Sequence, residues 1–223
     1  MPLDPTHFTV MCITQDGLPL THAAQATRLC AAGARWIQLR MKNVATEAWL
    51  AMAREVVSAC HAHGALCVIN DSLEIALASE ADGVHLGRLD FDWREARRRL
   101  GPLRLIGGTV HNVEEAGQAV AAGCLDYVGV GPLRFTATKR DLAPVLGLDG
   151  VRACLARLAG LPAWVIGGVE VDDLPLLQAA GAAGVAISGA LFRQDQIEEN
   201  YRALATAWNG QEASNKGHVP SAK

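Results

Sequence analysis

Two threonines and a lysine stand close together in the segment 131–140, which reads Gly-Pro-Leu-Arg-Phe-Thr-Ala-Thr-Lys-Arg. Glycine and proline begin the segment and end the short apolar run 127–130, which has the character of a buried strand. Hydroxyl groups, free backbone N–H groups and an ammonium on one loop suit an anion such as phosphate. A solvated surface loop with a chance Lys-Arg pair is the alternative, and this segment alone does not decide between them.

Other short apolar runs also end next to residues that can bind phosphates or metal ions. These residues are Gln38, Arg40, Lys42, Asn70, Asp71, Asp90, Thr109, Gly168, Ile187 and Ser188. Each has a local explanation as a helix cap, a turn residue or a solvated charge. Whether they form one site depends on the fold that positions them.

The apolar runs alternate with helical patterns, which is typical of a parallel sheet covered by helices. The expected strands are 8–13, 36–39, 66–69, 83–86, 103–109, 127–130, 163–166 and 184–188. The expected helices are 21–32, 46–63, 73–79, 92–99, 113–122, 148–158, 171–180 and 196–208, with a short helix opening at Gly189. These units predict a single (β/α)8 TIM barrel over residues 1–208 and a flexible tail at 209–223. An open doubly wound sheet is the alternative, although no dinucleotide-binding Gly-x-Gly-x-x-Gly follows the first strand.

The bulk composition narrows the class of protein. A chain of 223 residues fits one large α/β domain, and a net charge of −3 argues against nucleic-acid or membrane-surface partners. Six cysteines without a Cys-x-x-Cys pair predict buried free thiols rather than zinc or disulfides. No signal peptide and no membrane-spanning run is evident, so we expect a cytoplasmic protein. The oligomeric state is open, and a homo-oligomer is one alternative.

In a (β/α)8 barrel the active site lies at the carboxyl ends of the strands, where these polar residues would meet. Asp71 and Asp90 would offer the oxygen ligands that Mg²⁺ prefers, usually alongside substrate phosphates. Arg40, Lys42 and Lys139 would hold the remaining phosphate oxygens. The set contains no histidine or cysteine cluster, which disfavours zinc.

A second phosphate site is expected after the seventh and eighth strands. Backbone N–H groups at Gly168, Ile187 and Ser188 occupy the position where this fold commonly binds phosphate.

The same segments carry a resemblance to a known family. They are Gln38-Leu39-Arg40-Met41-Lys42, Asn70-Asp71, His85-Leu86-Gly87 with Asp90, Gly131-Pro132 through Thr136-Ala137-Thr138-Lys139, Ala143-Pro144 with Leu146-Gly147, and Ile166-Gly167-Gly168. In this order, over nearly all of residues 8–190, they resemble thiamine phosphate synthase. Ordered motifs of this kind are together far more specific than any one of them.

The resemblance implies a (β/α)8 transferase that joins hydroxymethylpyrimidine diphosphate to a thiazole phosphate, with one Mg²⁺ per subunit. Diphosphate leaves, a pyrimidinylmethyl cation forms, and the thiazole nitrogen attacks it. The residues implied to hold the pyrimidine diphosphate are Gln38, Arg40, Lys42, Asn70 and Lys139, with Thr109 beside it. The implied metal ligands are Asp71 and Asp90, and the implied thiazole phosphate ligands are Thr136, Thr138, Gly168, Ile187 and Ser188. Arg40, Lys42 and Lys139 would be catalytic, because they would stabilise the charge on the leaving diphosphate.

Some positions depart from the family pattern. Thr109 stands where the family usually has serine, and Arg88 stands where it usually has glutamine. Arg134-Phe135 replaces the usual phenylalanine and proline before the first threonine. The missing proline removes a constraint on φ, so we expect a looser loop.

Other functions are compatible with parts of this pattern. A related tautomerase that acts on the thiazole phosphate alone would not need the diphosphate-binding residues. A non-catalytic phosphate-binding or regulatory barrel would bind a ligand without a coordinated metal. A sugar phosphate isomerase would need a carboxylate or histidine base aimed at a carbon atom, and the sequence singles out none.

Overall fold

The computed structural model describes residues 4–135 and 144–216, and for residues 211–216 it describes the backbone only. The strands are β1 Val10–Ile13, β2 Trp36–Leu39, β3 Leu66–Asn70, β4 Gly83–Leu86, β5 Leu105–Val110, β6 Tyr127–Val130, β7 Ala163–Ile166 and β8 Gly184–Ile187. The α-helices are α1 His22–Ala31, α2 Thr46–Ala62, α3 Leu73–Ala78, α4 Trp93–Leu100, α5 Val113–Ala122, α6 Gly147–Arg157, α7 Leu174–Ala179 and α8 Ile197–Lys216. The 3₁₀ helices are η1 Pro5–His7, η2 Val171–Asp173 and η3 Gly189–Asp195.

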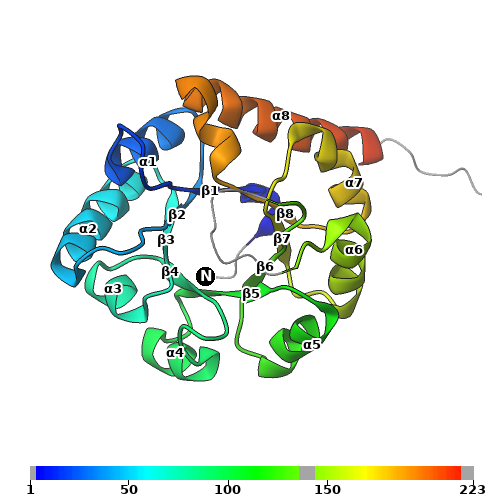
Figure 1. The fold of residues 1–223 in the computed structure, drawn as a ribbon, viewed down its shortest axis with the longest axis horizontal. Coiled ribbons are helices and arrows are strands. Elements are labelled where there is room, and N and C mark those ends of the chain that lie inside the picture. The colour runs from blue at the N-terminus through cyan, green and yellow to red at the C-terminus, as the bar shows by residue number, and fades with distance from the viewer. Residues whose placement is uncertain (1–3, 136–143, 217–223) are drawn as a thin grey trace, which may run out of the picture.

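Within these residues the strands form a closed parallel barrel in the order β1 to β8, and β8 pairs with β1. The helices surround the barrel as an outer ring (Figure 1). The predicted (β/α)8 barrel is therefore confirmed, and the open-sheet alternative is wrong. In such a barrel the carboxyl ends of all the strands meet at one rim, and the amino ends meet at the other.

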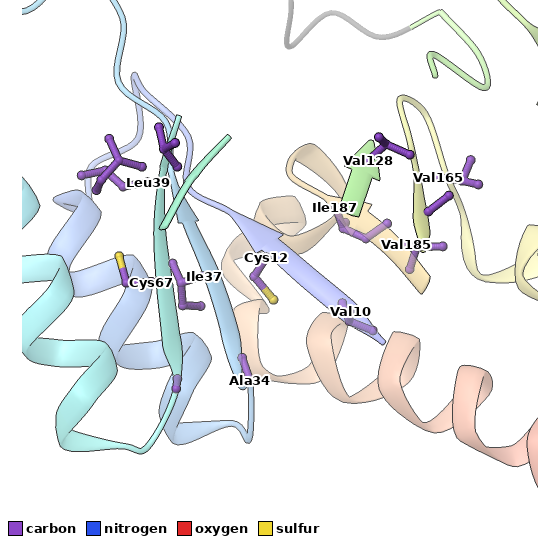
Figure 2. Close-up of a cluster of buried hydrophobic side chains, with 14 of the residues drawn as sticks. Val10, Cys12, Ala34, Ile37, Leu39, Cys67, Val128, Val165, Val185 and Ile187 are labelled. Carbon is purple, nitrogen blue, oxygen red and sulfur yellow. The ribbon is translucent and has the colours of Figure 1, made fainter. Parts of the chain in front are cut away.

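Alternation along each strand divides the apolar residues between two layers. Side chains that point outward pack against the helices, and Figure 2 shows Cys12, Ile37 and Cys67 of this outer layer on neighbouring strands. Side chains that point inward fill the barrel, among them the fully buried Trp36 and Trp164. The apolar runs thus have no polar face, because each strand is covered on both sides.

The filled interior lies in the amino-terminal half of the barrel. The Trp36 ring stands edge-to-face with Tyr127 at 4.8 Å and with Trp164 at 5.0 Å between ring centroids. Gly107 on β5 makes room for this packing, because a Cβ there would lie 2.2 Å from Cζ of Tyr127. The rings fill the amino-terminal half of the barrel. The polar residues lie at the opposite rim, at the carboxyl ends of the strands.

Element boundaries differ from the predicted ones in a few places. The predicted helix 171–180 is divided into η2 and α7, with Pro175 in the first turn of α7, where the missing N–H costs little. The last helix continues to Lys216, so the predicted end at Trp208 was wrong. The polar segment after Trp208 contains alanine, glutamine and glutamate, which are good helix formers. Residues 217–223 of the predicted tail lie outside the described residues.

The six cysteines are all free thiols, and all except the half-buried Cys124 are buried. None of the described helices combines the length and the apolar character that crossing a membrane requires.

Candidate active site

The residues singled out in the sequence lie at or just beyond the carboxyl ends of their strands. Gln38, Asn70 and Thr109 lie within β2, β3 and β5, and Ile187 ends β8. The residues that follow the strands are Arg40, Lys42, Asp71, Asp90, Gly168 and Ser188. The barrel therefore gathers these positions at one rim. Thr136, Thr138 and Lys139 lie outside the described residues.

Two carboxylates from neighbouring loops face each other at this rim. The pKa of Asp90 is raised because its carboxyl group is partly buried and lies beside the negative charge of Asp71. One oxygen of Asp90 also accepts the backbone N–H of Gly87 at 2.6 Å. The loop 87–90 thus holds this carboxylate toward Asp71 although both groups are acidic.

Asp71 is held in an unusual backbone conformation. Its φ of +68° lies in the left-handed region, and its N–H donates to the carbonyl of His85 at 2.8 Å. Ser72, not Asp71, caps helix α3. The Asp71 carboxylate is consequently free of a capping role and forms an ion pair with the ammonium of Lys42. Backbone strain at a polar residue of this kind is a feature of functional sites.

The carboxylate pair has the chemistry that Mg²⁺ requires. Mg²⁺ is often held by one or two protein carboxylates, and waters and substrate phosphates complete its coordination. Asp71 and Asp90 are such a pair, and a cation would relieve the repulsion that raises the pKa of Asp90. No group of three or more histidine, cysteine or acidic side chains in the described part of the chain is placed to hold a metal. The donor set therefore suits Mg²⁺ with a phosphate ligand better than a metal enclosed by protein.

The cationic segment after β2 is fixed through its backbone. Strand β2 ends at Leu39, and the N–H of Arg40 donates to Thr14 Oγ1 at 3.1 Å. The N–H of Lys42 donates to Asp16 Oδ2 at 3.2 Å. Among the described residues the Arg40 guanidinium has no carboxylate partner, so its donors are available to an anion.

A buried histidine links the polar rim to the aromatic interior. His85 Nε2 lies 2.9 Å from Thr109 Oγ1, and its Nδ1 lies 3.2 Å from the Tyr127 hydroxyl. Glycine at positions 107 and 129 leaves space for the imidazole ring. The sequence motif contained His85, but sequence reasoning gave it no role. The signal available was a histidine at an inward position of a continuously apolar strand.

The second predicted phosphate site also has an observable basis. The Ser188 hydroxyl is buried and has no hydrogen-bond partner in the described structure. Gly168 has a φ of +69°, and a Cβ there would lie 2.9 Å from Cβ of Arg134. A buried hydroxyl without a partner is costly, and a ligand oxygen would satisfy it.

The departure at Arg134 has an unexpected consequence for its loop. The Arg134 guanidinium donates two hydrogen bonds of 2.5 Å to Asp173 and one of 3.0 Å to the Gly168 carbonyl. Its backbone N–H donates to the Gly167 carbonyl at 2.9 Å. The start of the loop is therefore tied to the β7–α7 connection. The looser loop expected from the missing proline at Phe135 stays a prediction, because the rest of the loop, 136–143, lies outside the described residues.

A cavity of about 440 Å³ opens beside Lys42 and Asp71. It is lined by Met41, Lys42, Asn43, Val44, Trp49, Asp71 and Ser72. Of the proposed metal and diphosphate ligands, Asp71 and Lys42 line this cavity.

Comparison with known proteins decides the family. A family model described as thiamine monophosphate synthase matches residues 10–191. The chain belongs to the thiamine monophosphate synthase family.

Relatives and a solved structure agree with this assignment. A thiamine-phosphate synthase of Bacteroides fragilis is 40% identical over 202 residues, which are 88% of this chain and 98% of that protein. One from Myxococcus xanthus is 46% identical over 185 residues, 82% of this chain and 84% of that protein. The structure of thiamine phosphate pyrophosphorylase from Pyrococcus furiosus has a TM-score of 0.82 and 26% identity, and the match covers 93% of this chain and 98% of that one.

The resemblance drawn from the motifs is thereby confirmed, and so is the expected function. As a member of the thiamine monophosphate synthase family, the chain is a transferase that forms thiamine phosphate. This finding favours the synthase over a tautomerase, a regulatory barrel or a sugar phosphate isomerase.

Proposed function

We propose that the chain joins 4-amino-2-methyl-5-hydroxymethylpyrimidine diphosphate to 4-methyl-5-(2-phosphooxyethyl)thiazole, with release of diphosphate. The observation that carries the proposal is the contact between Lys42, Asp71 and Asp90 at the carboxyl rim. Paired carboxylates beside cations suit a substrate whose diphosphate binds together with a divalent ion.

The diphosphate would bind at the rim above β2 and β3. Arg40, Lys42 and Lys139 supply positive charge to its oxygens, and Gln38 and Asn70 supply amide groups. Asp71 and Asp90 would hold Mg²⁺, which when bound supplies electrophilic stabilisation of the leaving diphosphate. Thr109, which contacts His85, lies on β5 at the same rim.

The reaction breaks the C–O bond between the pyrimidine methylene carbon and the diphosphate. The electron pair leaves with the diphosphate oxygen, and the lone pair of the thiazole nitrogen forms the new C–N bond. Negative charge grows on the leaving oxygen, where Arg40, Lys42 and Lys139 stabilise it in the transition state. The thiazole nitrogen already has a lone pair, so the step requires no general base.

The thiazole phosphate would bind at the opposite part of the rim. Gly168, Ile187 and Ser188 would contribute backbone groups, and the buried Ser188 hydroxyl has no hydrogen-bond partner among the described residues. Thr136 and Thr138 would add hydroxyl groups from the loop after β6. Two anion sites on one rim would place the thiazole nitrogen near the methylene carbon that it attacks.

The setting of the enzyme is inferred from composition. The net charge of −3 supports small-molecule substrates without a nucleic-acid partner. A cytoplasmic location and a homo-oligomeric assembly are expectations that this site does not test.

The deciding experiment supplies both substrates with and without Mg²⁺ and follows diphosphate release. Asp71→Asn should raise the Mg²⁺ concentration needed for half-maximal activity, because a charged ligand becomes neutral. Asp82→Asn is the matched control, since Asp82 accepts the N–H of Cys67 at the amino end of β3. An Mg²⁺ titration that Asp71→Asn leaves unchanged would contradict the metal assignment.

A further inference from the structure

The loop between β1 and α1 holds the cationic segment after β2 at two points. Thr14 Oγ1 accepts the N–H of Arg40 at 3.1 Å, and Asp16 Oδ2 accepts the N–H of Lys42 at 3.2 Å. The N–H of Thr14 also donates to the carbonyl of Gln38 at 3.0 Å. The backbone of both proposed diphosphate-binding cations is therefore set by side chains of another loop.

One imidazole ring connects these two contacts. His22 lies in the first turn of α1 and is only 8% exposed. Its Nδ1 is 2.7 Å from Thr14 Oγ1, and its Nε2 is 3.1 Å from Asp16 Oδ1. The ring thus spans the two residues that hold Arg40 and Lys42.

The directions of these hydrogen bonds follow from the donors available. The Thr14 hydroxyl accepts from Arg40, and its own proton can be donated to His22 Nδ1. The proton of a neutral ring is then on Nε2, where it is donated to Asp16. Burial lowers the pKa of His22 more than the nearby Asp16 charge raises it, which keeps the ring neutral. In this tautomer each contact joins a donor to an acceptor.

A second buried side chain of α1 fixes the same loop. Gln25 is fully buried, and its Oε1 accepts the N–H of Gln15 at 2.9 Å. Its Nε2 donates to the carbonyls of Gln15 at 2.9 Å and Leu20 at 3.1 Å. The loop that carries Thr14 and Asp16 is consequently anchored on helix α1, so these two residues keep fixed positions relative to His22.

We propose that His22 is a positioning residue for diphosphate binding, which acts through Thr14 and Asp16 to fix the backbone of Arg40 and Lys42. This inference rests on the proposed assignment of those two cations to the diphosphate. Arg40 and Lys42 are two residues apart, so their grip on one anion depends on the backbone that they share. Small displacements of binding groups carry large losses of affinity and rate.

The test compares three substitutions that remove different parts of the ring. His22→Phe keeps the volume and removes both nitrogens, whereas an asparagine amide can replace Nδ1 and a glutamine amide can replace Nε2. We expect His22→Phe to raise the KM for the pyrimidine diphosphate about tenfold and to leave the KM for the thiazole phosphate unchanged. His22→Asn and His22→Gln should each restore part of the affinity, because each retains one of the two links.

Direct binding provides a readout that does not depend on turnover. Inorganic diphosphate with Mg²⁺, titrated calorimetrically, should bind His22→Phe about tenfold more weakly than the native chain. Should His22→Phe fail to fold, Thr14→Val and His22→Gln carry the same test. Each removes the contact through the Thr14 hydroxyl and leaves the contact through Asp16.

His61→Phe is the matched control at the other end of the barrel. His61 Nε2 lies 3.0 Å from Asp82 Oδ2, which accepts the N–H of Cys67 at 2.7 Å. As at His22, an imidazole contacts a carboxylate that accepts a backbone N–H, but here the contact lies at the amino end of β3, away from the carboxyl rim. His61→Phe should change neither KM.

The outcomes separate this inference from the proposed function. If Lys42→Ala weakens diphosphate binding but folded His22→Phe does not, the positioning role of His22 is wrong and the proposed site stands. Equal increases in both KM values for His22→Phe would also overturn it, because they indicate a general structural effect. If Lys42→Ala binds diphosphate normally, the assignment of the site fails and the inference fails with it.

Discussion

The two ends of the barrel are built on opposite principles. At the amino end, the rings of Trp36, Tyr127 and Trp164 are fully buried and stand edge-to-face, with centroids 4.8 to 5.7 Å apart. At the carboxyl end, Asp71 and Asp90 repel each other across a partly exposed rim. Aromatic packing stabilises the folded state, whereas a like-charge pair opposes it.

This difference indicates which end performs chemistry. The amino end stabilises the fold by burying apolar surface, and a bound ligand would change little in its packing. The carboxyl end retains a left-handed φ at Asp71, a carboxylate with a raised pKa at Asp90, and a Ser188 hydroxyl that has no partner within the described part of the chain. Features that cost stability persist where they serve binding or catalysis.

The largest effect on stability is expected at the amino end. Trp36→Ala should lower the free energy of unfolding by about 3–5 kcal/mol, because it removes a fully buried ring and leaves a cavity between Tyr127 and Trp164. Urea unfolding followed by circular dichroism measures this loss. The folded fraction should keep the native KM for both substrates. A raised KM in Trp36→Ala would show that the two ends are coupled.

The largest effect on catalysis is expected at the carboxyl end. Lys139→Ala should lower kcat by about 10²–10³-fold, equivalent to about 3–4 kcal/mol of transition-state stabilisation, because Lys139 would face the leaving diphosphate. Its urea unfolding curve should match that of the native chain. Arg140→Ala removes the neighbouring cation and should retain most of the activity. Native kcat in Lys139→Ala would remove this residue from the mechanism.

A smaller effect is expected at the tie between the β6 loop and β7. Arg134→Met removes the hydrogen bonds to Asp173 and Gly168, so the KM for the thiazole phosphate should rise about three- to tenfold. The exposed pair of Arg152 and Asp149 provides a control, and Arg152→Met should leave this KM unchanged. An unaffected KM in Arg134→Met would mean that the tie does not position the second phosphate site.

Sequence patterns were sufficient to predict the barrel and the rim on which its polar residues lie. Continuous apolar strands such as 127–130 can be satisfied only by a sheet covered on both sides, and the number of units determined that it closes. Because all carboxyl strand ends meet at one rim, Arg40, Asp71 and Gly168 could be assigned to it without side-chain geometry.

What the sequence did not reveal depends on contacts between loops. His22, Thr14 and Asp16 are ordinary polar residues near a helix start, and nothing in their spacing relates them to Arg40. Arg134 was interpreted only as a departure from the family pattern, because the partner that gives it a role, Asp173, is 39 residues away. Such pairings arise from tertiary packing, which local periodicity does not encode.

The smallest expected effect is the pH dependence of the Arg134–Asp173 tie. Arg134 holds the pKa of Asp173 below its ordinary value. The stability that this ion pair contributes is therefore complete above the pKa of an unfolded aspartate, about 4. It is lost as the pH falls through the lower pKa that Asp173 has in the folded state. Arg134 is half-exposed, so the contribution should be below about 1 kcal/mol.

Urea unfolding measures the difference in free energy of unfolding between the native chain and Arg134→Met. This difference should be larger at about pH 7 than at about pH 3. Trp36→Phe serves as the comparison from the amino end, because an apolar packing difference has no proton linkage and should be equal at both pH values. If both differences shrink alike, acid loosens the whole barrel and the tie is not its cause. If only that of Arg134→Met shrinks, the carboxyl loops are held by charge and the amino end by packing.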